Sequence, residues 1–102
     1  MSEKAPLFVA VGEVELHFPG ARSLKDKRQD LRSILERLRH RFTLLVVESD
    51  FQNLHQRAGL ALCAFATDAE ASRTTVVRAL EHIHENFAGI VLDERVALVQ
   101  VR

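Results

Sequence analysis

The chain has 102 residues, of which 47% are hydrophobic and 27% are charged, a balance typical of a globular protein rather than a disordered or fibrous one. Fourteen lysines and arginines balance fourteen aspartates and glutamates, so net charge alone does not indicate a nucleic-acid partner. A single cysteine, Cys63, excludes an internal disulfide and a cysteine-based zinc cluster. No apolar run reaches the ~20 residues of a membrane span, and the N-terminal segment lacks the basic start and cleavage site of a signal peptide. We therefore expect a cytoplasmic protein.

The first third of the chain predicts a strand followed by a helix. Apolar residues alternate over residues 7–18, with the even positions on one face, as in a half-buried strand. Pro19 and Gly20 then mark a turn. Ser23 is a good N-cap, and Asp26 sits where a capping box places its acidic residue. The helix that follows has an apolar stripe made of Leu24, Leu31, Ile34, Leu35, Leu38 and Phe42.

The rest of the chain predicts three further strands, at 43–51, 57–66 and 90–101, and a second helix. Thr67 and Glu70 form a capping-box pair that predicts the start of this helix. Its inner stripe is expected to hold Val76, Val77, Leu80, Ile83 and Phe87.

The resulting order, β-α-β-β-α-β, is that of the ferredoxin-like plait, an α+β fold. We expect a four-stranded antiparallel sheet in the order 4-1-3-2 with both helices on one face. Residues 1–102 are interpreted as a single domain, with residues 1–6 as a flexible N-terminal extension.

This topology places the loop after the first strand beside the turn between the second and third strands. The residues expected to form a site at this loop end are His17, Ser23, Asp50, Gln56 and Arg57. The N-terminus of the first helix, whose free N–H groups suit an anion, joins them there. We also expect Arg22 and Arg57 to share one electropositive rim. The alternative is a solvated turn in which Asp50 and Arg57 form a cross-strand ion pair.

Positive charge is concentrated in the first helix. Residues 22–41 carry eight lysines and arginines against three acidic residues. The candidate polyanion-binding residues are Arg22, Lys25, Lys27, Arg28, Arg32 and Arg39. Cations in the first turns of a helix oppose its dipole, a cost that a phosphate-bearing partner such as RNA would explain. The alternative is a flank that only solvates the protein, with Glu36 paired to Arg32.

The sheet face without helices is expected to form a homo-oligomer, most simply a homodimer, because an uncovered apolar patch usually marks an interface. The residues assigned to this oligomer face are Leu7, Val9, Val11 and Phe65. No metal site and no cofactor are predicted, since His82 and His84 point to different sides of a helix. Cys63 is interpreted as a buried, inert thiol.

Two known kinds of protein share the predicted topology, one of them enzymatic and the other RNA-binding. Acylphosphatases do, but Pro19–Ser23 resembles their catalytic loop only faintly, and the second strand has no asparagine to position water. RNA-recognition motifs stack bases on sheet aromatics, whereas only Phe65 could stack here. We therefore favour a non-enzymatic domain that contacts RNA electrostatically. The alternatives are a homo-oligomeric protein-interaction module without nucleic acid and a small anion-binding enzyme or sensor.

The motifs resemble the YlxP-like family of uncharacterised small bacterial proteins. The resemblance spans nearly the whole chain and includes Gly12–His17, the S-L-K-x-K-R segment at 23–28 and the Q-R-A segment at 56–58. It implies a ferredoxin-like fold and a cytoplasmic bacterial protein. In several bacteria the gene neighbours those for transcription termination, translation initiation and ribosome maturation, so the resemblance also implies an RNA-associated or ribosome-associated role.

Overall fold

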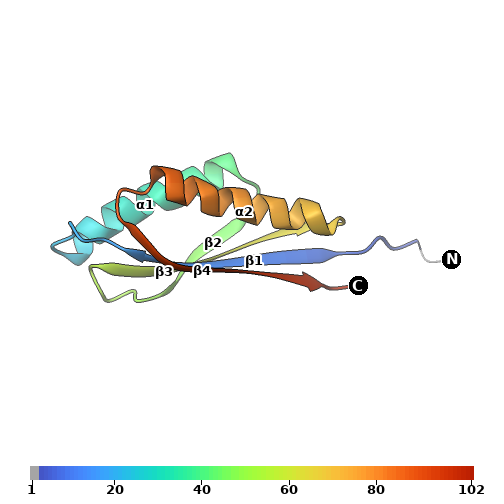
Figure 1. Cartoon of the computed structure of the whole chain (residues 1–102), viewed down its shortest axis with the longest axis horizontal. Coiled ribbons are helices and arrows are strands. Elements are labelled where there is room, and N and C mark those ends of the chain that lie inside the picture. The colour runs from blue at the N-terminus through green and yellow to red at the C-terminus, as the bar shows by residue number, and fades with distance from the viewer. Residues whose placement is uncertain (1–2) are drawn as a thin grey trace.

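A computed structural model describes residues 3–102 as two layers, with both helices lying on one face of the sheet (Figure 1). The elements in chain order are β1 (Phe8–His17), α1 (Leu24–Arg41), β2 (Leu45–Asp50), β3 (Arg57–Ala66), α2 (Ala69–Asn86) and β4 (Ile90–Gln100). The sheet order is β2-β3-β1-β4, and all three strand pairings are antiparallel. The predicted ferredoxin-like plait is therefore confirmed, including the spatial order of its strands.

The core lies between the sheet and the helices. The even positions of β1 face it, as the alternation predicts: Ala10, Val14 and Leu16 are buried. Gly12 lies at the closest approach of β1 to α2, where a Cβ atom would stand 2.7 Å from Cγ1 of Val76. Glycine at this position lets the helix pack directly on the strand.

The N-cap of α1 is confirmed and that of α2 is corrected. The Ser23 hydroxyl accepts the backbone N–H of Asp26 at 3.1 Å, as the sequence predicts. In α2 the cap is Asp68 rather than Thr67, because the Asp68 carboxylate accepts the N–H of Ala71 at 2.8 Å. A carboxylate is as good a cap as a hydroxyl and also favours the positive end of the helix dipole.

The N-terminal segment runs beside the end of β4. The N–H of Val101 donates to the carbonyl of Leu7 at 2.7 Å, and the Arg102 side chain donates to the carbonyl of Ala5 at 3.3 Å. The predicted flexible extension, residues 1–6, lies partly outside the described residues, which begin at residue 3. Neither α1 nor α2 is long and apolar enough to cross a membrane.

Candidate functional site

The exposed flank of α1 carries a shallow hollow with arginines around an apolar floor. Its volume is about 350 Å³. The residues that line it are Arg28, Leu31, Arg32, Leu35, Glu36 and Arg39. The hollow thus brings together three of the predicted polyanion-binding residues, because their spacing places them on one side of the helix. Lys25 is exposed one turn earlier on the same side, and Arg22 is exposed just before the helix begins.

The arginines of this hollow have little intramolecular charge compensation. Within residues 3–102, no carboxylate lies within ion-pair distance of Arg28 or Arg32, so the alternative Arg32–Glu36 pair is absent there. Arg39 donates one guanidinium N–H to the carbonyl oxygen of Val46 in β2, at 2.9 Å. This bond leaves most of its five N–H donors free and fixes the direction of the side chain. The hollow therefore presents uncompensated guanidinium groups to the solvent.

Lys27 does not belong to this surface, and its prediction as a polyanion-binding residue is wrong. Its exposed fraction is 0%. The ammonium Nζ lies 3.1 Å from Oε2 of Glu48 and donates to the carbonyl oxygens of Phe51, Gln52 and Arg57 at 2.9, 3.3 and 3.1 Å. An ammonium with one carboxylate and three carbonyl partners has no donor left for a ligand.

The sequence did contain a signal for this burial. Lys27 stands three residues after Leu24 and four before Leu31, inside the apolar stripe that also contains Ile34 and Leu38. A lysine in the core-facing stripe must find acceptors in the interior, because an uncompensated buried charge is strongly unfavourable. Here the acceptors come from the turn between β2 and β3, so Lys27 fastens the start of α1 to that turn.

The loop end predicted from the topology exists, and backbone bonds hold it together. The carbonyl of Gln56 accepts the N–H of Phe18 at 2.8 Å and lies 3.0 Å from Nδ1 of His17. The Gln56 amide donates to the carbonyl of Ala21 at 3.2 Å. The Ser23 hydroxyl caps α1, as described above. His17 and Gln56 therefore help to join the two loops to each other, whereas Ser23 bonds only within α1.

The helix N-terminus at this loop end is not an open anion cradle. The N–H of Arg22 donates to Oδ2 of Asp26 at 2.9 Å, so the carboxylate of the capping box lies beside the start of the helix. A carboxylate and a capping hydroxyl therefore already lie at the positive end of this helix.

Arg57, which was expected to share an electropositive rim with Arg22, has a carboxylate partner on the open face of the sheet. Its guanidinium pairs with the Glu15 carboxylate and stacks 4.4 Å from the ring centroid of Phe51. The alternative pairing of Arg57 with Asp50 is wrong, because Asp50 accepts the Ser49 hydroxyl at 3.1 Å. Phe51 itself has a φ of 62°, a left-handed conformation that is rare for an aromatic residue. The Lys27 ammonium bound to its carbonyl and the Arg57 stack on its ring hold it there.

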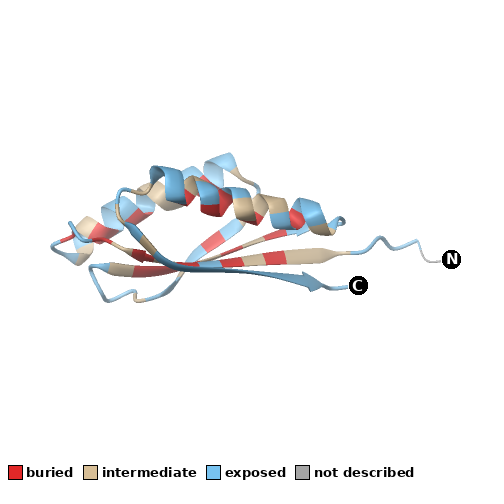
Figure 2. Cartoon of the chain, in the orientation of Figure 1, coloured by how far each residue is buried: buried red, intermediate tan, exposed pale blue. Residues whose placement is uncertain are grey.

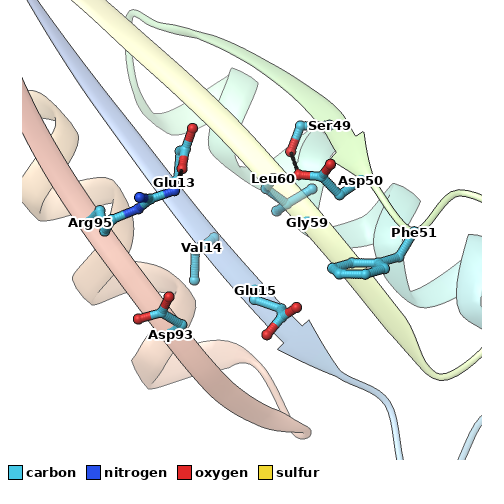
Figure 3. A pocket seen from close by; sticks show the side chains of 10 residues that line it. All are labelled: Glu13, Val14, Glu15, Ser49, Asp50, Phe51, Gly59, Leu60, Asp93 and Arg95. Atoms are coloured by element: carbon cyan, nitrogen blue, oxygen red, sulfur yellow. Dashed lines mark hydrogen bonds and ion pairs between the residues drawn. The ribbon is translucent and has the colours of Figure 1, made fainter.

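The polar half of the open sheet face is predominantly acidic. This half of the face contains a second shallow hollow, with a volume of about 300 Å³. Figure 3 shows it with the helices behind the sheet. Its carboxylates are Glu13, Glu15, Asp50 and Asp93, and Gly59 forms part of its floor. Arg95 pairs with Glu13 across the strands. In residues 3–102, no group of three or more His, Cys, Asp or Glu side chains is arranged to hold a metal ion.

The residues assigned to the oligomer face occupy the other, apolar half of the open face. Phe65 is 66% exposed, and its partners across the strands include Val9. Leu7, Val9 and Val11 are half-buried by their neighbours. Leu45 and Val47 of β2, which the sequence analysis did not include, extend this apolar half and are 67% and 57% exposed. The homo-oligomer itself stays a prediction.

The two histidines of α2 have separate environments. His84 lies 2.7 Å from Oε2 of Glu94 in β4. His82 stacks edge-on against Phe42, and burial, with smaller contributions from Arg41 and Arg37, lowers the pKa of its imidazole. Its Nε2 atom is buried without a hydrogen-bond partner. Cys63 is half-buried on the sheet.

The fold and the surface together define a small ferredoxin-like α+β protein with a basic first helix and an acidic open sheet face. Residues 9–96 match the model of a family described as "Protein of unknown function (DUF503)", and the chain belongs to this family. No curated protein matches the chain.

Two solved structures similar to this chain are de novo designs. "De novo designed protein Foldit4" is 15% identical with a TM-score of 0.55, and the match covers 94% of this chain and 99% of that one. "De novo designed protein Ferredog-Diesel" is 11% identical with a TM-score of 0.51, covering 95% and 89% of the two chains. At these identities the similarity shows the fold alone.

Proposed function

We propose that the chain is a non-enzymatic RNA-binding domain that contacts structured RNA through the α1 flank, in a ribosomal or transcriptional setting. The observation that carries the proposal is the hollow lined by Arg28, Arg32 and Arg39, since two of these guanidinium groups have no carboxylate partner within the described residues. Guanidinium groups match phosphate oxygens in a two-bond geometry, and Lys25 and Arg22 extend the flank by about one turn.

The distribution of charge favours the helix flank over the sheet as the RNA contact. Four carboxylates line the hollow on the open face, and two of them, Asp50 and Asp93, have no ion pair within residues 3–102, so this face disfavours phosphate. The open face carries the rings of Phe65 and Phe51, and the Arg57 guanidinium already stacks on Phe51, which gives no platform for stacking successive bases. The contact is therefore expected to be electrostatic and to depend on RNA shape more than on sequence.

The S-L-K-x-K-R segment at 23–28 and the Q-R-A segment at 56–58 extend the proposal to the kind of protein within the family. Within the family of unknown function, they favour a YlxP-like bacterial protein that acts in the cytoplasm. The neighbourhood of such genes is consistent with an RNA partner, as stated for the resemblance above.

Filter binding of the purified chain to total RNA across a salt series tests the proposal. If Lys25, Arg28, Arg32 and Arg39 each neutralise one phosphate, the slope of log affinity against log salt is roughly −3 to −4. The double variant Arg28→Glu/Arg32→Glu should abolish binding at the lowest salt. The matched control, Arg73→Glu/Arg78→Glu on α2, changes the net charge equally and should bind like the wild type.

Two results would contradict the proposal. One is the absence of binding at low salt, and the other is an equal loss of affinity in both double variants, which would indicate net charge rather than a site. A pull-down from lysate before and after nuclease treatment checks the interaction-module alternative. Partners that persist after nuclease would favour an acidic protein at the same flank.

A further inference from the structure

The outer edge of β4 is open along its C-terminal half. β4 is an edge strand that pairs with β1 on one side only. Val101 directs its N–H to Leu7, so the alternation of an antiparallel ladder turns the backbone groups of Val96, Leu98 and Gln100 outward. Within residues 3–102, no strand pairs with these outward N–H and C=O groups.

This edge lacks the features with which proteins usually prevent strand pairing. The run Val96–Val101 contains no charged residue and no proline. Val96, Leu98 and Val99 are 39%, 43% and 51% exposed. Figure 2 shows most of β4 in the colour of exposed residues, beside the partly buried β1.

The opposite edge of the same sheet is protected. β2 has six residues against eleven in β4, and its register shifts between Glu48 and Asp50. Arg39 donates a guanidinium N–H to the carbonyl of Val46 in this edge strand. Shortness, irregularity and charge are all known to block edge pairing, and β2 combines the three. The register shift of β4 against β1 and the charged residues of β4 lie in its N-terminal half, outside Val96–Val101. Of the two edge strands, β4 is therefore the one that is suited to pair with a further strand.

We propose that β4 pairs with β4 of a second copy of this chain in an antiparallel arrangement, with Leu98 opposite Leu98 of the second copy. Antiparallel pairing of a strand with itself creates a two-fold axis, so each copy offers and receives the same surface. Val96 then lies opposite Gln100 of the second copy, and all three outward-facing residues obtain backbone partners.

The charges flanking the apolar run select this register. With Leu98 on the axis, Glu94 lies opposite Arg102 of the second copy, and both side chains are exposed in the single chain. Moving the axis to Val96 would set Glu94 against Leu98 instead, so that its only polar neighbour would be His84 of its own chain. Opposite charges in directly facing positions stabilise a strand pair.

The resulting dimer has one continuous eight-stranded sheet with all four helices on the same face. α2 packs on β1, β3 and β4 while α1 packs on β2, so the basic flanks of α1 stay exposed at the two ends of the sheet. The inference is therefore independent of the RNA proposal. It also differs from a dimer stacked through Phe65 on the open face.

Sedimentation velocity over a concentration series tests the pairing, with the folded state of each variant checked by circular dichroism. Wild type should dimerise, and Leu98→Lys should weaken dimerisation about tenfold or more, because two like charges then face each other on the axis. Leu98→Glu should do the same. An equimolar mixture of the two variants should recover the dimer, since lysine and glutamate then lie opposite each other.

Phe65→Lys on the open face is the matched control and should dimerise like the wild type. A monomeric wild type at high micromolar concentration overturns the pairing. Dimers of Leu98→Lys as tight as those of wild type also overturn it. Loss of the dimer in Phe65→Lys alone would assign the interface to the open sheet face instead.

Discussion

The ammonium of Lys27 lies 3.1 Å from the carboxylate of Glu48, and this buried pair joins α1 to β2. The side chain of Lys27 is fully buried, whereas that of Glu48 is 22% exposed. The three carbonyl groups that share the ammonium all follow β2 or begin β3. The pair thus fixes the strained turn at Phe51 and the first turns of the basic helix in one position.

Removing this lysine should destabilise the fold strongly. Lys27→Met keeps the length of the side chain but leaves Glu48 and three carbonyls without their donor, so we expect a loss of about 3 kcal/mol in the free energy of unfolding. Urea unfolding followed by circular dichroism measures it. Lys25→Met, at an exposed position two residues earlier, is the control and should change stability by less than about 0.5 kcal/mol. Equal stability of the two variants would contradict the structural role of Lys27.

The contact between Gly12 and Val76 should show compensation between two substitutions. Gly12→Ala places a Cβ atom 2.7 Å from Cγ1 of Val76, and such overpacking typically costs about 1–3 kcal/mol. Val76→Ala removes the methyl group that clashes, so the double variant should lose less stability than the sum of the single variants. A double-mutant cycle from thermal or urea unfolding measures this coupling. Strict additivity would mean that β1 and α2 do not touch at this point.

His82 should make the stability of the protein depend on pH. Burial lowers the pKa of its imidazole in the folded protein below the ordinary value of 6.5. As the pH falls below about 6.5, the unfolded chain takes up this proton before the folded protein does, so the free energy of unfolding decreases. Above that pH both states are neutral at His82, and its contribution is constant.

The variant His82→Gln isolates this contribution. Unfolding measured between about pH 5 and pH 8 should show a shallower decrease on acidification than in the wild type. A His82→Gln slope identical to that of the wild type would show that the histidine titrates alike in both states.

A single arginine of the α1 hollow should account for one phosphate. Arg32→Gln should make the salt slope of RNA binding less negative by about 0.7–0.9, because one fewer counterion is released. The stability of the chain should hardly change, since Arg32 has no ion pair within residues 3–102. Binding at several salt concentrations gives the slope. An unchanged slope would remove Arg32 from the contact.

The sequence predicted the fold well because its signals are local. The alternation in β1, the Ser23 cap and the helical stripes each depend on residues within a few positions of one another, and the order of the elements then leaves few topologies. The Thr67 cap failed by one residue because Thr67 and Asp68 are both competent caps. The choice between them depends on where packing starts the helix.

The roles of individual charged residues could not be predicted in the same way. Asp50 ends β2 and Arg57 begins β3, so the two residues are close in sequence. Arg57 nevertheless pairs with Glu15, which lies 42 residues away along the chain. A long side chain can reach several carboxylates, and only the register and twist of the sheet decide which one is near.

By itself, the sequence determined the order of strands and helices, the core face of β1 and of the two helices, and the accumulation of cations in residues 22–41. Only the tertiary structure showed that Lys27 is buried and bound by groups of the interior, whereas Arg28 and Arg32 face the solvent. The physical reason is that periodicity places a charge on a face of its own helix, whereas its partners come from distant segments. The open edge of β4 could not be seen in the sequence for a similar reason, because a strand becomes an edge only when distant segments assemble into the sheet.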